Sequence, residues 1–209
     1  MSPLEALQAR LRRCRTCPKM IGPVVHGPPV RSKVYLVGQA PGDKEGPLGR
    51  PFAWTAGKTL FRWFHQALGV DEETVRTKVY FAAVARCFPG KAPKGGDRKP
   101  DELESKQCSR WMKAEVALLA PTLVLPVGAM AIERVLGHTG PLKEVVGRQF
   151  QTTFFGAQVE VIPLPHPSGA STWHITEPGK TLLISALELM RRNPTLVSVF
   201  QTQRSLSRW

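Results

Sequence analysis

Short apolar runs typical of strands alternate along this chain with longer amphipathic segments typical of helices. Strands are expected at residues 33–38, 78–86, 121–128 and 159–165. Helices are expected at residues 3–13, 55–69, 100–119, 129–137 and 179–192. Strands that alternate with helices predict an α/β fold, a three-layer α/β/α sandwich around a mostly parallel central sheet. In such a sheet the loops that follow the strands meet at one edge, where ligands bind.

The length and apolar content of the chain suit one domain. Its 209 residues are 42% hydrophobic, which is enough to bury a core. We expect a single domain over residues 1–193 and a loosely held, basic C-terminal tail over residues 194–209. No apolar run reaches the roughly 18 residues that a membrane span needs, and the N-terminus does not read as a secretory signal. The sequence therefore predicts a cytoplasmic protein without a membrane partner, and we expect a monomer.

Positive charge is the first indication of a partner. The chain has 29 Lys and Arg against 16 Asp and Glu, a formal net charge of +13. The basic residues form three blocks, within residues 10–33, 86–99 and 191–208. Such blocks can be solvated faces, but three of them in one small domain favour a surface that follows phosphates. Nucleic acid is the expected partner.

The four cysteines of the chain form a metal-binding pattern. Cys14 and Cys17 are a CxxC pair, and Cys87 and Cys108 follow later in the chain. Disulfides are not expected in a chain without a secretory signal, so the pattern favours metal or redox use. Four thiolates can close a zinc site or hold a [4Fe-4S] cluster, and the spacing does not decide between them. The alternative is four unrelated buried thiols.

Several motifs at the ends of the predicted strands together resemble the iron-sulfur uracil-DNA glycosylases of families 4 and 5. They are GQAPG…GRPF after the first strand, the ARC sequence that ends the second, and HPS after the last. Their order matches, as does the order of the cysteines, and the resemblance covers about residues 10–190. It implies the α/β/α sandwich of that superfamily, a [4Fe-4S] cluster on the four cysteines with zinc as the alternative, and hydrolysis of uracil from DNA.

Matched position by position, the resemblance places the chain as an outlying member. Where family 4 has the Glu of GEAPG, this chain has Gln39, followed by Ala40. The later family Glu is Glu45, and the stacking aromatic is Phe52. The uracil-reading Asn of family 4 is replaced by Ala83, a replacement that family 5 shares. Family 5 in turn has an Asp after the aromatic, where this chain reads AWTAG.

The chemistry of base removal explains why these residue types are candidates. A base in a duplex must be turned out and stacked on an aromatic ring, for which Phe52 is the candidate, although it is equally a core residue type. His166, followed in HPS by Ser168, is a candidate donor to the departing base. Glu45 or Asp43 is a candidate for handling the attacking water, or else belongs to a solvated turn.

Candidate DNA contacts lie in the same loops. Arg50 and Arg86 are expected either to contact phosphates or to pair with those acids. Trp173 is expected to wedge into the duplex or to pack inward. The remaining expected contacts lie in the basic loop, at Lys91, Lys94 and Arg98.

Three functions are compatible with these observations. The first is a repair hydrolase that cleaves the N-glycosidic bond of uracil, or of a related deaminated base, in DNA and leaves an abasic site. The second is a catalytically weak or inactive binder of damaged DNA that uses the same pocket, because Gln39 and Ala83 remove polar groups that family 4 uses. The third is a metal-stabilised nucleic-acid module without a base pocket. In the first two cases the protein would be associated with the nucleoid through DNA.

Overall fold

A five-stranded, mostly parallel sheet forms the centre of the molecule in a computed structural model that describes residues 1–93, 95–169 and 171–201. The strand order is β2-β1-β3-β5-β4. The first four pair in parallel, and β4 pairs antiparallel to β5 at the edge. The strands are β1 (Val34–Gly38), β2 (Tyr80–Ala83), β3 (Leu123–Pro126), β4 (Phe150–Phe154) and β5 (Ala157–Val161). The predicted mostly parallel sheet is confirmed.

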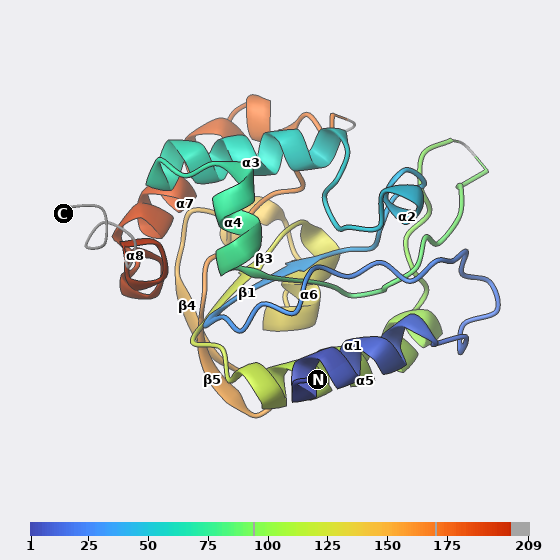
Figure 1. The fold of residues 1–209 in the computed structure, drawn as a ribbon. Helices are drawn as coiled ribbons and strands as arrows, with labels where there is room; N and C mark the ends of the chain where they lie inside the picture. The colour runs from blue at the N-terminus through green and yellow to red at the C-terminus, as the bar shows by residue number, and fades with distance from the viewer. Residues whose placement is uncertain (94, 170, 202–209) are drawn as a thin grey trace.

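Helices cover both faces of this sheet, which gives three layers (Figure 1). One face packs against α3 (Thr55–Leu68), α4 (Glu72–Lys78), α7 (Gly179–Arg192) and α8 (Pro194–Gln201). The other packs against α1 (Pro3–Arg12), α5 (Glu102–Leu119) and α6 (Ala129–Leu136). A hydrophobic core lies on each face of the sheet, and alternate residues of β1 pack into one or the other. Leu36 belongs to the core on the α3 side and Tyr35 to the core on the α5 side. The predicted three-layer α/β/α sandwich is therefore confirmed.

Local signals in the sequence set several helix boundaries. Ser2 with Glu5 and Asp101 with Glu104 each form a capping box, so α1 and α5 begin where the side chains satisfy the first backbone N–H groups. The predicted helix at 179–192 matches α7 at both ends. The short helix α2 (Glu45–Leu48) and the 3-10 turns η1 (Leu142–Glu144) and η2 (Trp173–Ile175) lie in loops.

The structure differs from the sequence prediction at the edge of the sheet. The strand expected at 159–165 is β5, which ends at Val161, and only a bridge between Val127 and Leu164 continues the pairing. Strand β4 was not predicted. It pairs with β5 through a two-residue turn, in which Phe155 and Gly156 both have positive φ. Such turns usually carry Asn-Gly or Asp-Gly, so Phe155-Gly156 gave a weak hairpin signal.

Two helices, α4 and α8, occupy residues that were expected to form part of a strand and part of a loose tail. The strand expected at 78–86 is shorter because α4 runs to Lys78, and β2 covers only Tyr80–Ala83. The expected loose tail from residue 194 begins instead with α8, whose Leu196 is fully buried in the core. Residues 202–209 lie outside the described part of the chain. No described helix is long and apolar enough to cross a membrane.

Candidate functional site

A cavity of about 600 Å³ opens where the parallel strands end. Its walls come from the loops after β1 and β2, the start of α6 and the loop after β5. The parallel sheet thus brings together loops that are far apart in sequence, as predicted. The predicted site residues that line this strand-end cavity are Gln39, Ala40, Asp43, Glu45, Phe52, Ala83, Arg86, Arg98, His166 and Ser168.

Phe52 presents its ring to this cavity from an unusual backbone conformation. Its φ is 52°, in the left-handed region that side chains rarely adopt. The ring lies against Gly38 at the end of β1, so closely that a Cβ there would meet the ring at 3.0 Å. It packs at a tilt against Phe81, with 6.2 Å between the ring centroids. The aromatic expected to stack on a base therefore forms part of the cavity wall.

The two candidate acids differ in their surroundings. Glu45 accepts hydrogen bonds from the backbone N–H groups of Gly42 at 2.8 Å and Ala53 at 3.1 Å. Burial raises the pKa of Glu45, and these backbone hydrogen bonds oppose that shift. Asp43 is 41% exposed and forms an ion pair with Lys91 at 3.3 Å. Glu45 thus ties the loop together, whereas Asp43 stays open to water at the rim.

His166 is held by its neighbour in the HPS motif. The backbone N–H of Ser168 donates to Nδ1 of His166 at 3.3 Å, and the Ser168 hydroxyl lies 2.9 Å from the same atom. A backbone N–H can only donate, so Nδ1 is an acceptor and the ring proton lies on Nε2. Burial, with a smaller contribution from His174, lowers the pKa of His166. The imidazole is therefore neutral near pH 7 and can donate one hydrogen bond.

Glycine makes room for this imidazole. Gly128, directly after β3, has a φ of 89°, and a Cβ there would lie 3.0 Å from Cδ2 of His166. Any other residue at this position would displace the ring and would adopt a strained backbone. The loops after β3 and β5 thus position His166 jointly.

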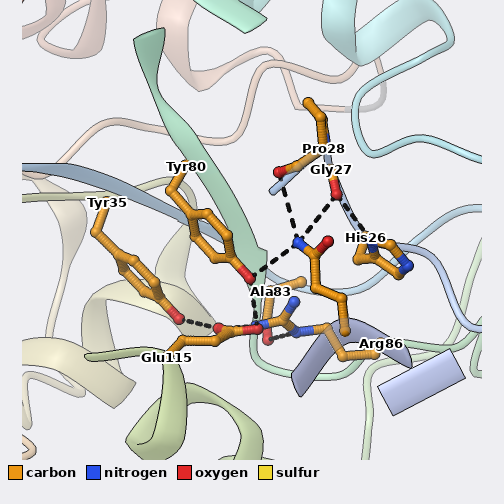
Figure 2. A network of polar contacts seen from close by, with 9 residues as sticks. His26, Gly27, Pro28, Tyr35, Tyr80, Ala83, Arg86 and Glu115 are labelled. Carbon is orange, nitrogen blue, oxygen red and sulfur yellow. Dashed lines mark hydrogen bonds and ion pairs between the residues drawn. The ribbon is translucent and has the colours of Figure 1, made fainter. Parts of the chain in front are cut away.

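A buried polar network lies behind the cavity, on the face of the sheet that packs against α1 and α5 (Figure 2). Glu115 of α5 is fully buried and accepts hydrogen bonds from Tyr35 at 2.5 Å, Tyr80 at 2.9 Å and Arg86 at 2.5 Å. Arg86 also donates through Nε to the carbonyl of Ala83 at 3.1 Å. The last residue of β2 is thereby fixed beside the cavity.

Arg86 is consequently not an exposed phosphate contact, and that expectation is corrected. It is 2% exposed, and its charge is paired with Glu115. Burial acts to lower the pKa of Arg86, but the charge of Glu115, together with smaller electrostatic contributions from neighbouring groups, outweighs burial and raises it, so the guanidinium stays charged. The network extends to α1, where Gln8 donates to Tyr80 at 3.4 Å and to the carbonyl of Gly27 at 3.2 Å.

Some of the other residues that were expected to contact DNA form ion pairs within the protein. Lys91 bonds Asp97 at 2.7 Å, and Arg98 forms two hydrogen bonds with Glu104, at 2.6 and 2.7 Å. Arg50 is 52% exposed, and the ion pair it forms among the described residues is a long contact of 3.8 Å with Glu72. Lys94 lies outside the described residues. Lys91 and Arg98 thus each form an ion pair within the protein, and the Lys91 side chain is still 56% exposed.

Trp173 packs inward, which is the alternative left open by the sequence. It is partly buried against the core formed with α3 and α7. Gly179, at the start of α7, lies so close that a Cβ there would meet the Trp173 ring at 2.7 Å. The expected duplex wedge is therefore corrected to a packing residue. Trp54 also lines the strand-end cavity and is 53% exposed.

The four cysteines line a second cavity, of about 380 Å³. Cys14 and Cys17 follow α1, Cys87 follows β2, and Cys108 lies in α5, so the cavity joins the N-terminal segment to the domain. Burial raises the pKa of Cys87 and of Cys108 to about 11 in each case. Arg86 borders both this cysteine cavity and the strand-end cavity.

The donor set fits a metal group. Cysteine side chains from three separate parts of the fold line one cavity. Four thiolates can hold a [4Fe-4S] cluster or close a zinc site.

Two buried groups that support the site were not predicted from the sequence. Glu115 lies on the apolar face of α5, close to Met112, Val116 and Leu119, and an acid at such a position was a readable signal of a buried partner. Arg76 of α4 is 5% exposed and donates to the carbonyls of Pro51 and Phe52, each at 3.0 Å. No pattern around Arg76 indicated this role, because the contact joins separate elements.

A mostly parallel sheet covered by helices on both faces, with a strand-end cavity lined by an aromatic ring and a histidine, places the chain in the α/β class of proteins. The sequence pattern of the uracil DNA glycosylase superfamily matches residues 24–188. The chain therefore belongs to the uracil DNA glycosylase superfamily.

Individual relatives agree with this assignment. The chain is 26% identical to a type-4 uracil-DNA glycosylase of Sulfurisphaera tokodaii over 67% of its own length and 61% of that protein. For the type-4 uracil-DNA glycosylase of Saccharolobus solfataricus the identity is 25%, over 81% of this chain and 78% of the relative. For the type-4 uracil-DNA glycosylase of Pyrobaculum aerophilum the identity is 29%, over 79% of this chain and 83% of the relative. The chain thus spans about three fifths of the first relative and about four fifths of the other two.

Proposed function

We propose that this protein hydrolyses the N-glycosidic bond of uracil, or of a related deaminated base, in DNA and leaves an abasic site. The observation that carries the proposal is the strand-end cavity, which is lined by both Phe52 and His166. Its volume of about 600 Å³ has room for a nucleobase with its sugar. Superfamily membership and the type-4 relatives support the same reaction.

The side chains that line the cavity suit the steps of this reaction. A base turned out of the duplex would stack on Phe52, which stands against Gly38. As the C–N bond breaks, the sugar becomes cationic and the base anionic. The neutral His166 would donate its Nε2–H to a carbonyl oxygen of the departing base, where negative charge develops. Asp43, at the wet rim, would orient the attacking water, and Glu45 would place negative charge near the sugar.

Base selection in this cavity rests on shape and backbone contacts. Ala83 ends β2 opposite Gly38 and has no group that can pair with the edge of a base. Gln39 and Ala40 follow β1 at the same place, so their backbone is available to a bound base. A site without a matched side-chain amide rejects related bases less strongly. We therefore include other deaminated bases among the substrates.

We also propose that Cys14, Cys17, Cys87 and Cys108 hold a [4Fe-4S] cluster with a structural role. The cluster would fasten the segment after α1 to β2 and α5, because its ligands come from all three. Purified protein should absorb at about 400 nm and contain about four irons per chain. Stoichiometric zinc without visible absorbance in protein prepared anaerobically would overturn the cluster and leave a four-cysteine site.

The decisive experiment is cleavage of an oligonucleotide that contains a single uracil, followed by alkali, with a thymine oligonucleotide as the control. We expect strand breaks at uracil only, in single- or double-stranded substrate. Replacing Phe52 by Ala should weaken base capture by about 1–3 kcal/mol, the usual value of one base–aromatic stack. Binding of uracil or abasic DNA without any cleavage would show a damaged-DNA binder instead. We further propose that the protein acts as a monomer on cellular DNA.

A further inference from the structure

The left-handed backbone at Phe52 needs an explanation, because an aromatic residue does not adopt it freely. A φ of 52° lies in the left-handed region, where the Cβ of an L residue is crowded by the backbone. Such conformations persist only where surrounding contacts hold them, and they concentrate at functional sites. The contacts that hold Phe52 therefore decide where its ring stands in the strand-end cavity.

One buried arginine holds both carbonyl groups beside this bend. Arg76 donates through Nη1 to the carbonyl of Pro51 and through Nη2 to that of Phe52, each at 3.0 Å. A planar guanidinium can direct separate donors at two successive carbonyls, which an ammonium group cannot do with the same geometry. The contact joins α4 to the loop between α2 and α3, across 24 residues of sequence.

Arg76 is itself fixed on three sides. Its Nε donates to Glu72 one turn earlier in α4, at 2.8 Å. Its guanidinium lies over the ring of Phe61, 4.6 Å from the centroid, and 5.6 Å from the centroid of Phe81. Phe81 also contacts the Phe52 ring. The same guanidinium therefore holds the backbone of Phe52 and packs on the ring that supports its side chain.

The other side of the bend is held by Glu45 and Gly57. Glu45 accepts the N–H of Ala53 at 3.1 Å, so the amide after Phe52 is fixed as well. Gly57 in the first turn of α3 leaves space for the carbonyl of Phe52, which would lie 1.8 Å from any Cβ at that position. The carbonyl of Phe52 therefore lies against Gly57 and accepts a hydrogen bond from Arg76.

We propose that Arg76 is a positioning residue that holds the Phe52 ring in the orientation that stacks on an everted base. The inference rests on the proposed function for its consequence in base capture, whereas the positioning itself is a property of the fold. Arg76 does not line the cavity and would touch neither base nor sugar. Its effect must therefore pass through Phe52.

The first arm of the test measures the loop without any substrate. Hydrogen exchange of residues 45–56 is compared in the unaltered protein, Arg76→Lys and Arg76→Gln. Exchange should rise at least several-fold in both variants, while exchange in α7 stays unchanged. Arg191→Gln is the matched control, because Arg191 also pairs with a glutamate on its own helix, at 2.6 Å, and does not line the cavity. If Arg76→Gln fails to fold, Arg76→Lys, which keeps the charge, carries the test alone.

The second arm measures base capture with an oligonucleotide that contains 2′-fluoro-deoxyuridine, a uracil nucleotide that resists cleavage. Arg76→Lys should weaken binding about 5- to 10-fold, within the range of one base–aromatic stack. It should raise KM more than it lowers kcat and should leave the pH profile unchanged. In a Phe52→Ala background the same substitution should have no further effect, because the ring through which it acts is gone.

The outcomes separate this inference from the proposed function. Unchanged exchange in residues 45–56, or a loss on Arg76→Lys that persists in the Phe52→Ala background, would overturn the positioning role. If the unaltered protein neither binds nor cleaves uracil DNA, the proposed function is wrong and the role in base capture falls with it. In that case the exchange experiment still decides whether Arg76 holds the Phe52 bend.

Discussion

At the scale of single residues, the chemistry of the cavity depends on a histidine that stays uncharged. Ser168 supplies a donor to Nδ1 of His166, and burial lowers the pKa of the ring. Protonation at Nδ1 would turn this accepted hydrogen bond into a clash between two donors. The neutral form is thus favoured by geometry and by burial together, and it leaves Nε2–H available to a developing anion.

Replacing His166 by Ala should lower the rate of uracil cleavage by about 10²–10³, the typical cost of one charge-stabilising donor. Because the pKa of His166 is lowered from its usual value of about 6.5, the rate should be flat from pH 7 to 8. It should fall only in acid, at a pH below that usual value. Single-turnover rates across pH measure both effects. An unchanged rate in His166→Ala would remove this residue from the chemistry.

A second residue-scale prediction concerns base selection at the end of β2. Ala83 is 9% exposed and faces Gly38 in register, beside the ring of Phe52. Ala83→Asn would add an amide that can accept from N3–H of uracil and donate to O4. Uracil cleavage should become faster relative to that of other deaminated bases, because a matched amide rejects bases that lack the match. Equal gains for all bases would contradict this view of selectivity.

At the scale of elements, the buried network joins α5, β1 and β2 behind the cavity. Glu115 is fully buried and paired with Arg86, whose Nη1 has no hydrogen-bond partner among the described residues. Removing one partner of a buried ion pair leaves an uncompensated charge. These strands carry Gly38 and Ala83 to the cavity, so the network contributes both to stability and to the position of the cavity floor.

Replacing Glu115 by Gln should therefore lower the free energy of unfolding by about 3–5 kcal/mol, because the charge of Arg86 is left buried and unpaired. Urea denaturation measures the loss. Glu133→Gln on the exposed side of α6 is the matched control, with an expected change within about 0.5 kcal/mol. Similar values for the two variants would show that the Arg86–Glu115 pair does not contribute as a charged pair.

The elements also show how far sequence reasoning extends. The sandwich, the four parallel strands and the convergence of the strand-end loops followed from periodicity, which depends on local spacing. Strand β4 was missed because Phe155-Gly156 is a weak turn signal, and α8 was missed because its burial through Leu196 depends on distant residues. Arg76 and the partners of Glu115 could not be predicted, since their contacts join separate elements.

At the scale of the whole molecule, the net charge of +13 comes from two kinds of basic side chain. Some are buried or held in ion pairs, and others are exposed and can contact DNA. Arg76 and Arg86 are buried, and Lys91 and Arg98 are held in ion pairs. Lys44 and Lys99 line the strand-end cavity, are exposed, and form no ion pair within the described part of the chain. Among the described residues, the unpaired basic side chains that line the cavity are therefore fewer than the count of basic residues suggests.

Binding to DNA should fall steeply with salt, because each neutralised phosphate releases counterions. If the rim and the N-terminal basic block together contact about five phosphates, log Kobs against log salt should have a slope of roughly −4 to −5. Lys44→Gln and Lys99→Gln should each reduce the magnitude of that slope by about one, whereas Lys113→Gln on the exposed side of α5, outside the three basic blocks, should leave it unchanged. Titrations of a labelled oligonucleotide at several salt concentrations measure these slopes. A slope near zero would show that the positive charge is scattered over the molecule. An equal reduction in Lys113→Gln would show that DNA does not bind preferentially at the rim of the strand-end cavity.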